Sequence, residues 1–294
     1  MKLYTVFHNG KEKLAAEASG GKLYGLNELG AEASDMNELI DDWETIGEQL
    51  RKKLAEINAD ENAFADKILK DYQILAPIPR PKQDVVCLGV NYFDHMKEAA
   101  AGIDFVKKAE TIYFSKRVSR ANDPDGLIPM YDFVDSLDYE AELGVVIGKD
   151  AFGVSAEDAR DFIFGYTIIN DVSGRNVQKR HQQWYLGKSL DGYTPMGPCI
   201  VTKDEIGDPH DLFIRCSVNG ELRQDSSTKY MITSVEDAIA ELSQGMTLQK
   251  GTVIATGTPA GVAMGMNPPI WLKSGDVVSI EIENIGQLTN TIGE

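Results

Sequence analysis

The sequence predicts an α+β protein that is mostly β, with a small N-terminal α/β domain ahead of a larger strand-rich domain. Strand-like runs dominate the chain from Asp84 onward, whereas apolar residues between about residues 37 and 57 recur at helical spacing. The two parts are joined by residues 76–81, where alternating prolines cannot continue a helix and favour an extended connector. We therefore expect a small domain over residues 1–76 and a larger one over residues 77–294.

The N-terminal domain is expected to combine a β-hairpin with helices. Asn9-Gly10 lies between two short strand-like pieces and is a strong signal for a hairpin turn. One helix is predicted over residues 37–57 and another over residues 62–72, because apolar side chains there follow the helical period.

The larger domain is expected to consist mainly of strands. Asn219-Gly220 closes another predicted hairpin, and Ser234 opens a helix that ends before Gly245. The predicted strands cover residues 85–89, 112–114, 137–147, 164–171, 212–218, 277–283 and 286–291.

The composition is that of a soluble globular protein with a strongly acidic surface. The chain has 46 acidic and 29 basic residues and a formal net charge of −17, which repels nucleic acid and anionic membranes. We see no apolar run long enough to span a membrane and no signal-peptide pattern, and the three cysteines lack metal-site spacing. We expect a cytoplasmic protein in which an anionic substrate would need a local positive centre.

Three carboxylates are the most informative candidate site. In a strand over residues 137–147, Glu140 and Glu142 would project from one face, and Asp171 ends the strand predicted after it. Taken alone, such a glutamate pair is typical of the solvated face of a half-buried sheet. Three converging carboxylates without His or Cys ligands would instead suit a hard divalent cation such as Mg²⁺ or Mn²⁺.

Two polar pairs accompany the carboxylates. His95 and Glu98 share a face if their segment is helical, and a carboxylate beside an imidazole favours a general base. Arg175 and Gln178 closely follow the third carboxylate, where the arginine could bind a substrate carboxylate by two hydrogen bonds. The alternative for each pair is an exposed turn of helix.

Two lysines and one loop complete the candidates. Lys188 sits among small residues, and Lys116 follows a predicted strand, where a plain surface lysine is the alternative. Thr258 lies in the loop 256–262, whose two glycines would let backbone N–H groups approach an anion.

These motifs occur in a characteristic order from Gly89 onward. They read Gly-x-Asn-Tyr-x-x-His-x-x-Glu, Asp-Tyr-Glu-x-Glu-Leu, Asn-Asp-Val-Ser, Gly-Lys-Ser, Val-Asn-Gly, Thr-Gly-Thr-Pro-Ala-Gly-Val and Gly-Asp-Val-Val. The order resembles the fumarylacetoacetate hydrolase family over the chain from about Asp84 to the C-terminus. The preceding residues resemble the small, variable leading domain that many members carry.

The resemblance implies a role for each matched residue. Three carboxylates would bind the divalent cation, which is Mg²⁺ or Mn²⁺ (or Ca²⁺ in a crystal): Glu140, Glu142 and Asp171. Three residues would act in catalysis, the first two as a general-base pair and the third beside the metal: His95, Glu98 and Lys188. Four residues would contact the substrate: Lys116, Arg175, Gln178 and Thr258.

Two departures from the family pattern concern the region around the substrate. The family often reads Phe-x-Lys-Pro where this chain has Arg117 in place of proline, with Arg120 close behind. This basic segment fits an extra carboxylate on the substrate, a different acyl chain, or surface variation. Residues 99–108 look like an insertion after the His-x-x-Glu motif.

The resemblance implies a divalent-metal-dependent hydrolase that cleaves a carbon–carbon bond in a small anionic acylpyruvate-type or β-diketo 2-oxo acid. The metal would polarise the 2-oxo group, and His95 held by Glu98 would deprotonate the attacking water. The alternatives are a decarboxylase, hydratase or isomerase acting on oxaloacetate, a 2-hydroxydienoate or a homoprotocatechuate-pathway acid, and a non-catalytic metal-binding dimer. The family fold is a mixed, mostly β roll, usually packed as a homodimer, and we expect both here.

Overall fold

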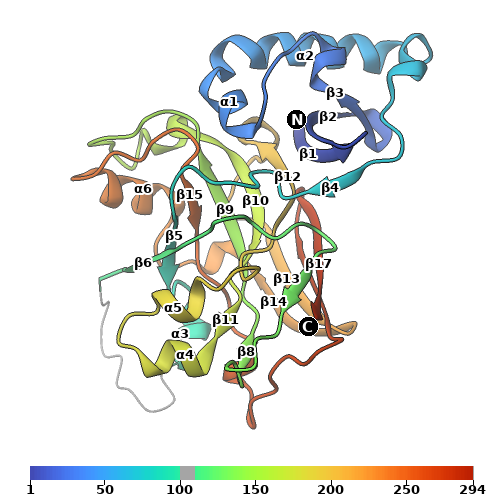
Figure 1. Cartoon of the computed structure of the whole chain (residues 1–294). Helices are drawn as coiled ribbons and strands as arrows, with labels where there is room; N and C mark the ends of the chain where they lie inside the picture. Colours follow the sequence, from blue (N-terminus) through green and yellow to red (C-terminus); the bar gives the residue numbers. More distant parts are fainter. Residues whose placement is uncertain (100–109, 294) are drawn as a thin grey trace.

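The protein, as a computed structural model, is a mixed α and β fold made mostly of sheet (Figure 1). The structure describes residues 1–99 and 110–293, with the side chains of residues 97–99 left out. The predicted fold class, α+β and mostly β, is confirmed.

The helices and strands have the following bounds. The helices are α1 (Met36–Asp41), α2 (Trp43–Ala59), α3 (Phe93–Ala99), α4 (Arg175–Arg180), α5 (Tyr185–Lys188) and α6 (Val235–Ser243). The strands are β1 (Lys2–His8), β2 (Lys11–Ala18), β3 (Lys22–Gly25), β4 (Gln73–Leu75), β5 (Val85–Gly89), β6 (Ile112–Lys116), β7 (Leu127–Pro129), β8 (Leu137–Asp138), β9 (Ala141–Ile147), β10 (Ile163–Asn170), β11 (Ser173–Gly174), β12 (Met196–Thr202), β13 (Phe213–Val218), β14 (Glu221–Ser227), β15 (Val253–Ala255), β16 (Val277–Ile282) and β17 (Gly286–Gly293).

Two sheets form the framework of the described part of the chain. The larger has ten strands in the order β3-β2-β1-β12-β10-β9-β15-β5-β6, with β4 also paired to β1. The smaller has five strands in the order β14-β13-β16-β17-β7, while β8 pairs with β11. The described pairs are antiparallel except for β15 with β5 and β17 with β7. β9 lies inside the larger sheet, between β10 and β15.

The N-terminal hairpin extends the larger sheet. β1 pairs with β12, with Leu3 opposite Ile200, so the sheet continues from the N-terminal region into the rest of the chain. Trp43 of α2 packs edge-on against Phe164 of β10, with ring centroids 4.9 Å apart. In Figure 1 the N-terminal elements lie at one end of the molecule, and α3, α4 and α5 gather toward the other. The domain division after residue 76 stays a prediction.

The predicted strand over residues 137–147 is two strands, β8 and β9, because the backbone leaves the ladder between them. There the N–H of Glu140 donates to the side-chain oxygen of Asn170 over 3.1 Å. Every residue of β9 is buried, since the strand is flanked by β10 and β15 and packed on both faces. Glu142 lies in this strand and is 1% exposed, and Glu140, just before it, is 5% exposed, so the solvated-face alternative for the two glutamates is wrong.

The predicted N-terminal helices are shorter than expected. The helix over residues 37–57 is divided into α1 and α2, because Asp42 both ends the first and precedes the second. The segment 62–72 contains a 3-10 turn (Glu61–Lys67) rather than a regular helix, and its chain then enters β4. The predicted helix start at Ser234 is confirmed, since its hydroxyl accepts the N–H of Asp237 over 3.0 Å.

Candidate metal and substrate site

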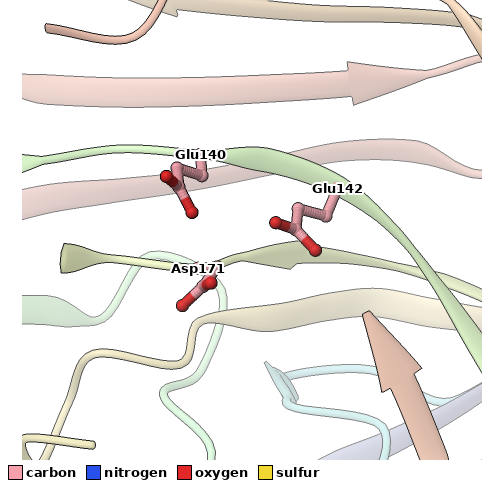
Figure 2. A group of neighbouring side chains, drawn as sticks. All are labelled: Glu140, Glu142 and Asp171. Carbon is pink, nitrogen blue, oxygen red and sulfur yellow. The ribbon is translucent and has the colours of Figure 1, made fainter. Parts of the chain in front are cut away.

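Glu140, Glu142 and Asp171 lie together where β9 and β10 meet. Glu142 is opposite Ile169 in the antiparallel pair, and the N–H of Asp171 donates to the carbonyl of Glu140 over 3.0 Å. One carboxylate oxygen from each residue lies within 4.8 Å of the others. Figure 2 shows the three carboxylates converging on one space from two neighbouring segments. The strand register therefore brings the three predicted carboxylates together.

The three carboxylates are buried, which makes their charges costly unless they are compensated. Burial and the neighbouring carboxylates of Asp171 and Glu140 raise the pKa of Glu142 well above its usual range. Burial alone would also raise the pKa of Glu140, but the cationic Arg175 and Lys188 outweigh it and lower that pKa. Three hard oxygen donors at this spacing could hold a divalent cation, whose charge would relieve the repulsion on Glu142.

Two buried lysines neutralise part of this charge. Lys188 at the end of α5 donates from Nζ to Glu140 and to Oδ2 of Asp171, the latter over 2.6 Å. Lys116 at the end of β6 donates to Oδ1 of Asp171 over 2.6 Å and to the carbonyl of Val172 over 3.0 Å. The surface alternative for Lys116 is wrong, since its side chain is 0% exposed. It lies behind Asp171 rather than on the cavity wall.

Arg175 is fixed by protein acceptors on each of its nitrogens. Its Nε donates to Oδ2 of Asp138 over 2.8 Å, Nη1 donates to Oε1 of Gln178 over 3.0 Å, and Nη2 donates to Glu140. Asp138 in turn accepts the N–H groups of Ala263 and, over 3.2 Å, Met264. The guanidinium is therefore held in place before any ligand binds.

Asp138 is a residue that sequence reasoning left out of the site. A signal for it existed, because Asp138, Glu140 and Glu142 occupy alternate positions of one acidic run. Its charge explains how an arginine can be buried beside the carboxylates, since each buried ion needs a partner.

Gln224 on β14 is a second residue that sequence reasoning missed. Its Oε1 accepts the N–H of Ala141 over 3.1 Å, and its Nε2 donates to Oγ1 of Thr258 and to the carbonyl of Pro259, both over 2.8 Å. This buried amide connects β9 to the loop that carries Thr258. One glutamine in a strand gives no local signal for such a role.

The predicted anion-binding loop serves a carboxylate of the protein. The N–H of Gly257 donates to Oε2 of Glu142 over 2.8 Å. Gly257 has a φ of +88°, and a Cβ there would lie 2.7 Å from the Cβ of Asn91. Only glycine fits this close approach, which holds the loop against the end of β5.

A cavity of about 300 Å³ opens in front of Glu140 and Glu142, whereas Asp171 is not among its lining residues. Seven of the predicted site residues line it: His95, Glu140, Glu142, Arg175, Gln178, Lys188 and Thr258. His95 lies on α3 and is 5% exposed. The side chain of Glu98 and most of the insertion-like segment 99–108 lie outside the described residues.

Comparison with known proteins identifies the family. Residues 84–293 match the family model described as fumarylacetoacetate (FAA) hydrolase C-terminal. The chain belongs to the fumarylacetoacetate hydrolase family. It is therefore an enzyme, and the resemblance stated from the motif order is confirmed. None of the helices in the described residues is long and apolar enough to cross a membrane.

Two curated relatives of this family member are oxaloacetate tautomerases. The chain is 46% identical over 226 residues to oxaloacetate tautomerase YisK of Bacillus subtilis, covering 76% of this chain and 74% of that protein. It is 43% identical over 221 residues to a mitochondrial oxaloacetate tautomerase of Xenopus laevis, covering 74% of this chain and 68% of that protein.

Solved structures of hydrolases share the whole fold. A fumarylacetoacetate hydrolase from psychrophilic Exiguobacterium antarcticum is similar with a TM-score of 0.83 and 37% identity, over 100% of this chain and 99% of that one. A maleylpyruvate hydrolase from Sphingobium sp. SYK-6, in complex with manganese(II) and pyruvate, has a TM-score of 0.72 and 26% identity, with both chains fully covered.

Proposed function

We propose that this protein is a divalent-metal-dependent tautomerase of a small 2-oxo acid of the oxaloacetate class. The observation that carries the proposal is the buried triad of Glu140, Glu142 and Asp171 beside a cavity that also holds Lys188 and His95. Two relatives above 40% identity are named oxaloacetate tautomerases, and one structural neighbour contains manganese(II) with a 2-oxo acid, pyruvate.

The cavity residues supply what keto–enol interconversion needs. A divalent cation held by the triad would act as a Lewis acid toward the 2-oxo group. During tautomerisation one proton leaves C3 and one is added to the oxygen on C2, so no other reactant is consumed. We assign the proton transfer at C3 to His95, which lines the cavity. Glu98 stays the predicted partner of this imidazole.

Two cationic groups and one amide group would bind the oxygen atoms of the substrate. The ammonium of Lys188 would stabilise negative charge as it develops on the C2 oxygen, an effect worth on the order of 3 kcal/mol. Arg175 and Gln178, fixed to each other by a hydrogen bond, would orient the carboxylate that adjoins the 2-oxo group. Thr258 lines the same cavity and is held by Gln224.

Hydrolysis of a carbon–carbon bond in an acylpyruvate is the second candidate. Its support is the 37% identical fumarylacetoacetate hydrolase, together with an imidazole that could deprotonate water. In that reaction water adds to the distal carbonyl, the carbon–carbon bond breaks, and the departing carbon takes up a proton. Both reactions need stabilisation of the same oxygen on C2.

One pair of assays separates the two candidates. Oxaloacetate is mixed with the Mg²⁺-loaded protein, and the enol is followed by ultraviolet absorbance above the spontaneous rate. Acetylpyruvate is supplied separately, and pyruvate release is measured with a coupled dehydrogenase. We expect fast equilibration of oxaloacetate without loss of total 2-oxo acid. Faster pyruvate release from acetylpyruvate would favour the hydrolase, and no acceleration of either reaction would overturn the proposal.

The remaining expectations are also proposals. We propose that the enzyme works as a homodimer with Mg²⁺ or Mn²⁺ in the cytoplasm. Light scattering on the purified protein tests the dimer, and metal titration of chelator-treated protein tests which ion restores activity.

A further inference from the structure

Lys179 and His181 lie at the open side of the cavity. Both side chains line it although both are exposed, whereas the carboxylates and Lys188 at its floor are buried. Lys179 directly follows Gln178 on α4, so its position is set by the same helix that carries Arg175. Within the part of the chain that the structure describes, neither the side chain of Lys179 nor that of His181 has a hydrogen-bond or ion-pair partner.

The charged groups at the floor of the cavity can balance the charge of one ligand carboxylate, but not of two. Three buried cations lie at the floor or directly behind it, and only the last two line the cavity: Lys116, Arg175 and Lys188. Four buried carboxylates accompany them, of which Glu140 and Glu142 line the cavity: Asp138, Glu140, Glu142 and Asp171. When all of these groups are charged, they carry one net negative charge. A bound divalent cation would turn this into one net positive charge. The 2-oxo carboxylate would balance that charge, so a second carboxylate buried beside it would have no counter-charge.

Aromatic side chains connect the floor with the mouth. Phe114 and Trp184 both line the cavity and pack edge to face, with ring centroids 5.2 Å apart. Trp184 lies against Gly89, where a Cβ would come within 2.5 Å of the indole ring. Phe114 also lies under Nζ of Lys188, 5.3 Å from its ring centroid, so the two rings form a continuous wall that begins at the floor of the cavity that Lys179 and His181 also line.

The basic segment with Arg117 and Arg120, one interpretation of which was a contact with an extra carboxylate of the substrate, lies outside the cavity. Arg120 pairs with Asp123 over 2.9 Å and with Glu12 over 3.4 Å, and neither Arg117 nor Arg120 lines the cavity. Among the described residues that line the cavity, the lysines and arginines are Arg175 and Lys188 at its floor and Lys179 at its mouth.

We infer that Lys179, assisted by the imidazole of His181, binds the distal carboxylate of a 2-oxo dicarboxylic acid and selects it over 2-oxo monocarboxylic acids. The inference rests on the proposed function, because the 2-oxo end of the substrate must occupy the floor. Lys179 acts here as a specificity-determining residue. Its ammonium forms a charge-assisted hydrogen bond that a methyl group in place of the carboxylate would lack.

The test compares two ligands of equal carbon number on two matched variants. Oxaloacetate and 2-oxobutyrate differ only by a carboxylate in place of a methyl group. Lys179→Met removes the proposed contact, whereas Arg180→Met removes a neighbouring exposed cation that does not line the cavity. Dissociation constants are measured for the Mg²⁺-loaded proteins by tryptophan fluorescence, to which Trp184 in the cavity wall contributes, and KM is measured alongside.

We expect Lys179→Met to weaken oxaloacetate binding about tenfold and to leave 2-oxobutyrate binding unchanged. Arg180→Met should change neither. Equal weakening of both ligands by Lys179→Met, or no change for oxaloacetate, would overturn the inference and leave the proposed function standing. A wild-type protein that binds neither 2-oxo acid would overturn the proposed function together with this inference.

Discussion

Lys188 donates a hydrogen bond from Nζ to Oδ2 of Asp171 over 2.6 Å, and both side chains are almost completely buried. The same ammonium also bonds Glu140, so one lysine joins two of the three candidate metal ligands. A buried cation between buried carboxylates is stabilising only while every partner is present. The pair therefore links the stability of the fold to the groups that would hold the metal.

Replacing Lys188 with methionine should destabilise the metal-free protein. The change leaves one carboxylate oxygen of Glu140 and one of Asp171 without their buried cationic partner, and breaking a buried ion pair in this way typically costs about 3–5 kcal/mol. The free energy of unfolding is measured in urea with a chelator present, and Lys229→Met, at an exposed lysine, is the control. Addition of Mn²⁺ should restore much of the loss, because the ion replaces the missing positive charge. A metal-free K188M protein as stable as the wild type would contradict this view of the site.

Replacing Glu142 with glutamine should separate metal binding from folding. Because burial and like charges raise the pKa of Glu142, loss of its charge should not destabilise the metal-free protein. Affinity for Mn²⁺ should fall by about 100-fold or more, since the loss of an outer contact of a metal site alone costs about 10- to 100-fold. Calorimetric titration measures the affinity, and Glu221→Gln, at a glutamate with a side chain 67% exposed, is the matched control. Unchanged Mn²⁺ affinity in E142Q would exclude this triad as the metal site.

Replacing Gln224 with leucine should loosen both β9 and the loop that carries Thr258. The variant leaves the N–H of Ala141 and the carbonyl of Pro259 without their partner, at about 1–3 kcal/mol for each buried group. Urea unfolding measures the loss, and turnover should fall as well, because Thr258 loses its hydrogen bond. Gln287→Leu, at an exposed glutamine of β17, controls for the change of side chain. Equal stability of Q224L and Q287L would show that the amide does not connect the two segments.

Val90 gives a test of backbone strain beside the cavity. It has a φ of +55°, a conformation that costs a β-branched residue about 1–2 kcal/mol. The turn is held because Asn91 donates to the carbonyls of Thr233 and Thr256, the latter over 2.8 Å. Val86, a half-buried valine in β5, is the control, because its backbone is in an ordinary strand. Val90→Gly should therefore destabilise the protein by about 1–2 kcal/mol less than Val86→Gly, since glycine relieves the strain only at Val90. Equal losses in the two variants, measured by urea unfolding, would show that Val90 is not strained.

Much of the candidate site could be predicted because strand patterns carry local information. The alternation of side chains placed Glu140 and Glu142 on one side of a strand, and a strand end placed Asp171 near them. The order of short motifs identified the family without any knowledge of distances. The burial of these carboxylates could not be predicted, because it depends on which strands flank β9.

The sequence by itself therefore determined the strand-rich fold class, the family, and three carboxylates with a nearby lysine and histidine. Only the tertiary structure decided that Lys116 lies behind Asp171, that Gln224 bonds a residue 83 positions away, and that Lys179 reaches the cavity while Arg120 pairs elsewhere. The physical reason is that periodicity fixes which side chains share a face of one strand. Partners across long separations are set by how the sheets pack, and no local pattern records that.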